Sequence, residues 1–167
     1  MAPLFFIFLV FLLSSTPYSA GRSININISS STLLQFSSLA WDPIAQHFVA
    51  GSNLDSAVYA IPETGTVKCI ISKPSSNNSI TGISTTAVAV DHVHQRLIVA
   101  FSNHSSVAAY DLKSYRRIYA MPLPQLDGAP SGVVVDLESG EVLVSSASRG
   151  VLLKVGPYGD TDRKSVV

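Results

Sequence analysis

Beyond residue 22 the chain alternates short apolar runs with polar turn residues, and no stretch keeps the period of an amphipathic helix. The apolar runs are rich in β-branched and aromatic side chains, as at residues 48–50, 57–61, 97–100 and 133–135. Gly, Pro, Asn, Asp and Ser, the residues that favour turns, separate the runs. This alternation predicts an all-β chain.

The same local sequence precedes three of the predicted strands. An apolar residue is followed by an aspartate, then by a polar turn, then by the strand. The aspartates are Asp42, Asp91 and Asp136, which lie 49 and 45 residues apart. Because further apolar runs follow each turn, each unit has room for about four strands, and that repeat is typical of a β-propeller blade.

We therefore predict a partial β-propeller over residues 21–155. Its three blades are expected at about residues 33–72, 82–122 and 130–155, followed by a divergent tail, 156–167, without a strand. The alternating segment 23–28 is expected to form a strand that completes a last blade in a longer protein. Propellers close with about four to eight blades, so three blades leave two open sheet faces. We expect self-association through these faces.

The repeated aspartates favour a structural role over a catalytic one. Each of Asp42, Asp91 and Asp136 stands where a strand passes into a turn. A carboxylate at this position can accept hydrogen bonds from the backbone N–H groups of the turn. We interpret all three as turn formers of the blades.

The amino terminus is typical of a secretory signal. Residues 4–13 are ten apolar residues without interruption, too few for the roughly 20 that a membrane span requires. Small residues follow as far as Ala20, so we predict a signal peptide over residues 1–20 and no membrane span after its cleavage. Sequons at Asn27, Asn77 and Asn103 fit this route and predict N-glycosylation. The expected destination is extracellular, apoplastic or vacuolar.

Composition excludes several classes of function. The 11 Lys and Arg residues equal the 11 Asp and Glu residues, and nucleic-acid binding requires clustered positive charge. The only basic cluster, Lys113, Arg116 and Arg117, is interpreted as a solvated hairpin. A single cysteine, Cys69, excludes an intrachain disulfide and a cysteine-based zinc site. Because Cys69 lies in an apolar strand, we expect its thiol to be buried and inert.

Three segments carry a resemblance to a known family. Residues 36–43 with 57–59 resemble the opening blade of the senescence-marker-protein/gluconolactonase-like six-bladed propellers, a TolB-like fold. Residues 130–144 resemble blades of that family and NHL-type blades, and residues 111–117 resemble a second-blade hairpin. The chain is most similar to the N-terminal half of secreted plant members labelled calcium-dependent phosphotriesterase-like.

This resemblance implies a divalent metal in the central channel of the propeller. At the positions that match the family's metal ligands, however, this chain has other residues. Active members carry a Glu four residues before the tryptophan and an Asn five residues before the later aspartate. Here these positions are Ser37 and Ser131. A hydroxyl is a poor replacement for a carboxylate on a hard divalent cation. We therefore predict no catalytic residue, no metal ligand and no cofactor, with calcium or another divalent metal only if a full-length enzyme exists.

The sequence thus favours a secreted, non-catalytic binding or interaction module for an unknown ligand or protein. One alternative is a metal-dependent hydrolase of lactones or phosphotriesters in a full-length form. The other is a truncated product without independent function.

Overall fold

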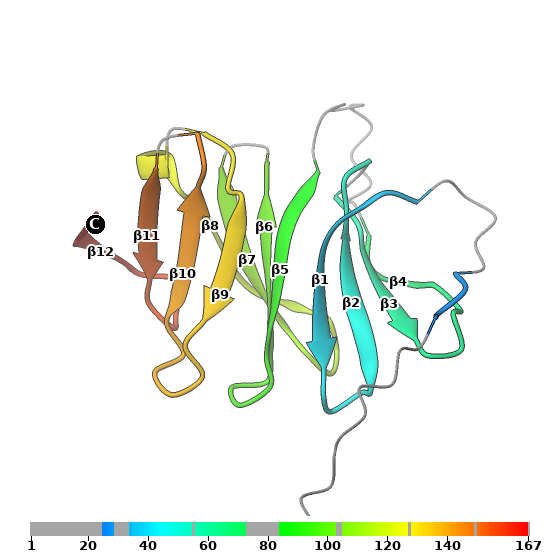
Figure 1. Cartoon of the computed structure of the whole chain (residues 1–167). Coiled ribbons are helices and arrows are strands. Elements are labelled where there is room, and N and C mark those ends of the chain that lie inside the picture. The colour runs from blue at the N-terminus through cyan, green and yellow to red at the C-terminus, as the bar shows by residue number, and fades with distance from the viewer. Residues whose placement is uncertain are drawn as a thin grey trace, which may run out of the picture.

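The computed structural model describes residues 25–28, 34–54, 56–72, 84–102, 105–126, 128–148 and 150–166. Within these ranges the chain forms three antiparallel sheets of four strands each (Figure 1). The first sheet contains β1 (Phe36–Asp42), β2 (His47–Ser52), β3 (Val58–Pro62) and β4 (Lys68–Ile71). The second sheet contains β5 (Thr85–Asp91), β6 (Arg96–Phe101), β7 (Ser106–Asp111) and β8 (Arg117–Pro122). The third contains β9 (Gly132–Val135), β10 (Val142–Ser146), β11 (Val151–Val155) and β12 (Thr161–Val166), and a short 3-10 turn, η1 (Pro124–Leu126), precedes it.

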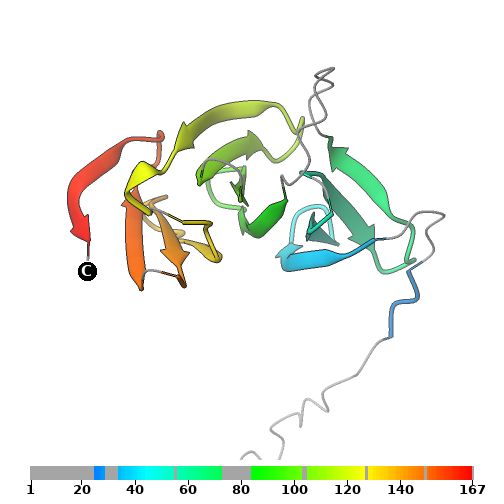
Figure 2. The same cartoon turned by 90° about the horizontal axis from the view of Figure 1, so that it is seen from above.

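The sheets follow one another along an arc, and we call them blades 1, 2 and 3 (Figure 2). In each blade the strands are paired in sequence order. The first strands, β1, β5 and β9, contact one another along the inner side of the arc. The last strands, β4, β8 and β12, lie on the outer side and are the edges of their sheets. This is the arrangement of consecutive propeller blades.

The hydrophobic core lies between the blades, because alternate residues of a strand point to opposite faces of its sheet. On β6, Leu97 and Val99 pack against blade 1, whereas Ile98 packs against blade 3, and all three are fully buried. A central blade therefore buries both faces. The outward faces of blades 1 and 3 instead expose large apolar side chains, namely Leu39, Trp41, Val134 and Leu152.

The end of the chain differs from the sequence prediction. We expected no strand after Val155, but β12 pairs antiparallel with β11. A turn at Gly159, whose φ is +87°, reverses the chain before β12. An edge strand forms through backbone hydrogen bonds to its neighbour, and strand formation depends strongly on such context. The hydrophobic pattern of the sequence therefore missed it.

The segment before blade 1 bears on a second prediction. The strand predicted at 23–28 would complete a last blade of a longer protein and stays a prediction; in this chain its described residues, 25–28, are not in a strand. Instead, Ile26 and Ile28 line a depression together with Leu39 and Phe48 of blade 1. The apolar members of the alternating pattern thus lie against an existing sheet and do not add a strand to it.

A buried ion pair of blade 2 includes the arginine that connects this blade to blade 3. The Arg96 Nη2 atom lies 2.6 Å from Asp91 Oδ2, and both side chains are buried. The same guanidinium donates to the backbone oxygen of Gly140 at 2.8 Å and to that of Pro157. These two carbonyls belong to the β9–β10 and β11–β12 turns. One side chain therefore holds two turns of the neighbouring blade.

Glycine at position 140 allows this approach. Gly140 has a φ of +73°, and a Cβ atom there would lie 2.9 Å from Arg96 Nη2. The matching turn positions in blades 1 and 2 are Gln46 and Gln95, with φ values of 55° and 56°. In all three blades, the fourth residue after the aspartate therefore has a left-handed backbone conformation.

Candidate functional site

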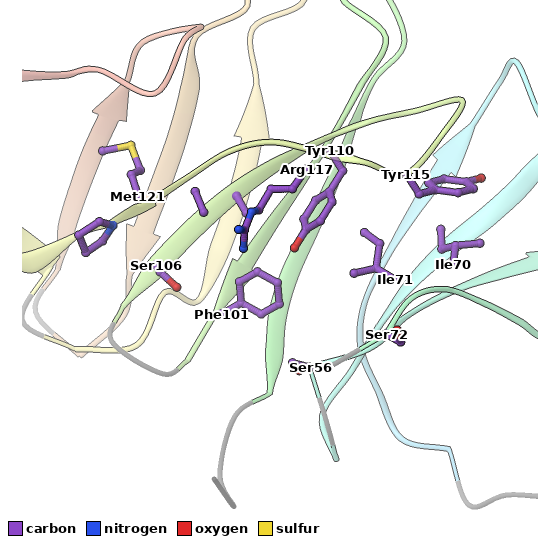
Figure 3. Close-up of a pocket in the computed structure, with 13 residues that line it drawn as sticks. Ser56, Ile70, Ile71, Ser72, Phe101, Ser106, Tyr110, Tyr115, Arg117 and Met121 are labelled. Atoms are coloured by element: carbon purple, nitrogen blue, oxygen red, sulfur yellow. The ribbon is translucent and has the colours of Figure 1, made fainter. Parts of the chain in front are cut away.

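A groove of about 680 Å³ separates the outer parts of blades 1 and 2 (Figure 3). Its blade 2 wall follows from strand alternation, because Ser106, Ala108 and Tyr110 are every second residue of β7 and share one face. Phe101 of β6 continues this wall. The facing wall comes from the outer strand of blade 1. Its lining residues on and beside that strand are Ile70, Ile71 and Ser72.

The groove exists because neighbouring blades diverge towards their outer strands. Close to the inner strands, Val58 and Leu97 fill the space between blades 1 and 2. The corresponding space between blades 2 and 3 is filled near η1, where Leu123 and Leu126 are fully buried in the core. These two leucines show that apolar side chains can fill the space between diverging blades.

One cation belongs to the groove. Arg117, the first residue of β8, is exposed, lines the groove and lies opposite Tyr110 in the strand register. No ion pair joins Arg117 to a carboxylate within the residues that the structure describes. Its charge acts on the Tyr110 phenol, as the pKa of Tyr110 shows. Burial raises that pKa above its ordinary value, and the nearby guanidinium acts in the opposite direction.

Within the part of the chain that the structure describes, one buried hydroxyl of the groove has no hydrogen-bond partner. Ser56, in the segment before β3, is 7% exposed and lines the groove. Its Oγ atom is buried without a donor or acceptor in reach. Leaving such a group unpaired costs about 1–3 kcal/mol. A ligand that lies in the groove and pairs with Ser56 would recover part of that free energy.

Tyr115 stands at the rim of the groove, in the β7–β8 turn. Burial raises the pKa of its phenol, and the negative charge of Asp42 raises it further. Tyr110 and Tyr115 are therefore protonated at neutral pH. The groove thus combines an apolar floor with hydrogen-bond donors and a single positive charge.

The predicted turn aspartates lie where a strand meets its turn, away from the groove. Asp42 Oδ1 accepts from the Ile44 N–H at 2.8 Å, and Asp91 Oδ1 accepts from the His94 N–H at 3.0 Å. Asp136 Oδ1 accepts from the Glu138 N–H at 3.0 Å. In each blade the carboxylate therefore holds the turn.

The two serines at the family's metal positions bond to the backbone. Ser37 Oγ donates to the backbone oxygen of Gly51 at 3.2 Å and contacts that of Thr85. Ser131 Oγ lies 3.2 Å from the Ser145 carbonyl and accepts from the Ala147 N–H at 3.0 Å. Hydroxyls held in this way do not fit the carboxylate and amide ligands of a divalent metal. Among the described residues, no three His, Cys, Asp or Glu side chains gather in a way that could hold a metal ion.

The structure describes only one of the three predicted glycosylation sites. Asn27 is exposed. Asn77 and Asn103 lie outside the described residues, as does the predicted signal peptide. In the described part of the chain, no helix has the length and apolar character needed to cross a membrane.

Sequence reasoning missed Arg117 and Ser56 as residues of the groove. Arg117 belongs to the cluster that we interpreted as a solvated hairpin, yet it lines an apolar groove. Ser56 carried no signal, because only the fold brings it beside blade 2. The expectation of a buried Cys69 is wrong, since its side chain is exposed. Cys69 lies on β4, which is the outer edge of its sheet.

Comparison with known proteins gives the fold. No family model matches the chain, and no curated protein matches it. Among solved structures, the chain is similar to the crystal structure of Saccharomyces cerevisiae Sqt1, a β-propeller protein, with a TM-score of 0.58 and 14% sequence identity. The match covers 77% of this chain and 35% of that one.

At this identity the likeness shows the fold alone. The prediction of an all-β partial β-propeller is confirmed. The resemblance to the gluconolactonase-like family stays a prediction.

Proposed function

We propose that this chain is a secreted, non-catalytic binding module that takes a segment of a partner protein into the groove between blades 1 and 2. The observation that carries the proposal is the groove itself, with an apolar floor, the unpartnered Ser56 hydroxyl and the positive charge of Arg117. Its volume is within the range of about 300–1,000 Å³ that is typical of ligand sites. The propeller fold adds support, since its blades supply rigid walls.

The enzyme alternative has less support in the geometry. The family's metal chemistry would need strong ligands at positions 37 and 131, and both hydroxyls there bond to the backbone. We therefore propose binding without catalysis, with the extracellular space, apoplast or vacuole as the location.

Filling the groove tests the proposal. Ala120 lines the groove and is exposed, so Ala120→Trp should obstruct it. Ile118→Trp is the matched control, because Ile118 lies on the same strand, is 54% exposed and does not line the groove. The probe is a panel of fluorescently labelled peptides with apolar residues, titrated with the full chain and followed by anisotropy.

We expect Ala120→Trp to abolish peptide binding while Ile118→Trp leaves it unchanged. Circular dichroism of both variants checks that the sheets remain intact. The proposal fails if no peptide of the panel binds, or if both variants bind equally well.

A further inference from the structure

We infer that the groove recognises an acidic, leucine-bearing segment in which two apolar side chains stand three residues apart beside a carboxylate. This inference rests on the proposed function and names the chemistry of the partner. Two observations carry it, one from each blade interface.

We infer the spacing of the partner's apolar residues from the interface between blades 2 and 3, which the chain itself fills. There Leu123 and Leu126, three residues apart around the turn η1, are fully buried between the blades. The open groove presents a similar apolar surface to an incoming chain, from Ile71, Phe101 and Ala108. A segment with the same leucine spacing would bury its side chains in the same way. Burying each leucine side chain would favour binding, because it removes apolar surface from water.

The carboxylate follows from charge. Among the described residues that line the groove, Arg117 is the only charged one. A guanidinium binds a carboxylate through two parallel hydrogen bonds, which gives direction as well as attraction. The protonated Tyr110 phenol opposite Arg117 in the register supplies a further donor. A lysine-bearing segment would meet repulsion at the same place.

Substitution of Ser56 gives an independent test of whether a ligand binds in the groove. Because its buried Oγ atom has no partner, Ser56→Ala removes no hydrogen bond from the ligand-free protein. A merely structural serine would give a loss of stability on substitution. For a ligand-binding serine we expect unchanged or higher thermal stability together with weaker binding of the peptide.

The experiment compares six-residue peptides of one design, acetylated and amidated at their ends. All peptides carry two leucines three residues apart. One other position holds glutamate, glutamine or lysine, and this position is varied from peptide to peptide. Binding to the full chain is measured by fluorescence anisotropy. Arg117→Gln is compared with Arg116→Gln, a matched control because Arg116 is exposed and does not line the groove.

We expect the best glutamate peptide to bind at least about 5-fold more tightly than its glutamine form, which is about 1 kcal/mol for an accessible ion pair. Arg117→Gln should remove that difference, whereas Arg116→Gln should keep it. Raising the salt concentration should reduce it. Ser56→Ala should weaken binding without lowering the melting temperature.

The outcomes separate the two proposals. If glutamine and glutamate peptides bind equally in a way that Ala120→Trp blocks, the acidic specificity is wrong and the binding function stands. If no peptide binds, the proposed function is wrong. If peptide binding falls as protein concentration rises, a second copy of the chain occupies the groove, and the inference is overturned.

Discussion

Replacing Arg96 by methionine should strongly destabilise the chain, because it leaves a buried carboxylate without its partner. Arg96 Nε and Nη2 lie 3.1 and 2.6 Å from Asp91 Oδ2, and Asp91 is 0% exposed. Removing one member of such a pair costs about 3–5 kcal/mol. Total stability is about 5–15 kcal/mol for a domain. The change should therefore lower the melting temperature by about 10–20 °C.

The assay is unfolding in guanidinium chloride, followed by Trp41 fluorescence and circular dichroism at one fixed protein concentration, since association alters apparent stability. The control is His47→Met. His47 stands five residues after Asp42, as Arg96 stands five residues after Asp91, but its Nε2 atom is buried without a partner. We expect the control to change the free energy of unfolding by less than about 1 kcal/mol.

The double variant Asp91→Asn with Arg96→Met should be destabilised by less than the sum of the single changes, because it leaves no buried charge unpaired. An Arg96→Met variant as stable as the natural chain would refute the role of the ion pair. So would strictly additive effects in the double variant.

The ion pair also predicts the response to acid. Burial alone would raise the pKa of Asp91, but hydrogen bonds from His94 and Arg96 and the charge of Arg96 bring it below 3.8. A lowered folded-state pKa contributes stability that is present above the unfolded value and lost as pH falls through the folded value. The natural chain should therefore lose this contribution only below about pH 4. In Arg96→Met, burial acts on Asp91 without the opposing effect of the arginine, so the folded-state pKa of Asp91 rises and the stability that this group loses on acidification should shrink.

Three further predictions concern the whole chain. Residues 21–167 expressed alone should aggregate or pair with a second copy, because the outward faces of blades 1 and 3 expose Leu39 and Val134 by 59% and 58%; a soluble monomer in sedimentation that unfolds cooperatively would contradict this. Calorimetry with calcium, manganese or zinc should show no tight site, and a micromolar dissociation constant that Asp136→Ala abolishes would prove this prediction wrong. N-terminal sequencing of the secreted product should give a start near residue 21, and a start at Met1 would exclude signal cleavage.

Much of the fold could be predicted from local patterns. The spacing of Asp42, Asp91 and Asp136 marks the first turn of each blade, because each carboxylate accepts hydrogen bonds within its own turn. Such contacts span only two or three residues, so the sequence displays them directly. The strand β12 could not be predicted in this way, since it forms through pairing with the edge of β11.

The groove could not be predicted because its two walls come from different blades. Ser56 precedes β3 of blade 1, and Arg117 begins β8 of blade 2. In the sequence they are 61 residues apart, and neither has a neighbour that indicates a site. Only the side-by-side position of the two sheets brings an unpartnered hydroxyl and a cation to one apolar surface.

The repeat predicts the blades better than the contacts that join them. Five residues after the repeated aspartate of each blade stand His47, Arg96 and Glu141. Arg96 reaches into blade 3, whereas Glu141 pairs within its own sheet, 2.6 Å from Lys154. The backbone of the turn is the same, but the side chain decides whether a blade is bound to the next one. His47, at the matching position of blade 1, has no hydrogen-bond partner for its buried Nε2 atom among the described residues, and the groove that we propose as the binding site opens between blades 1 and 2.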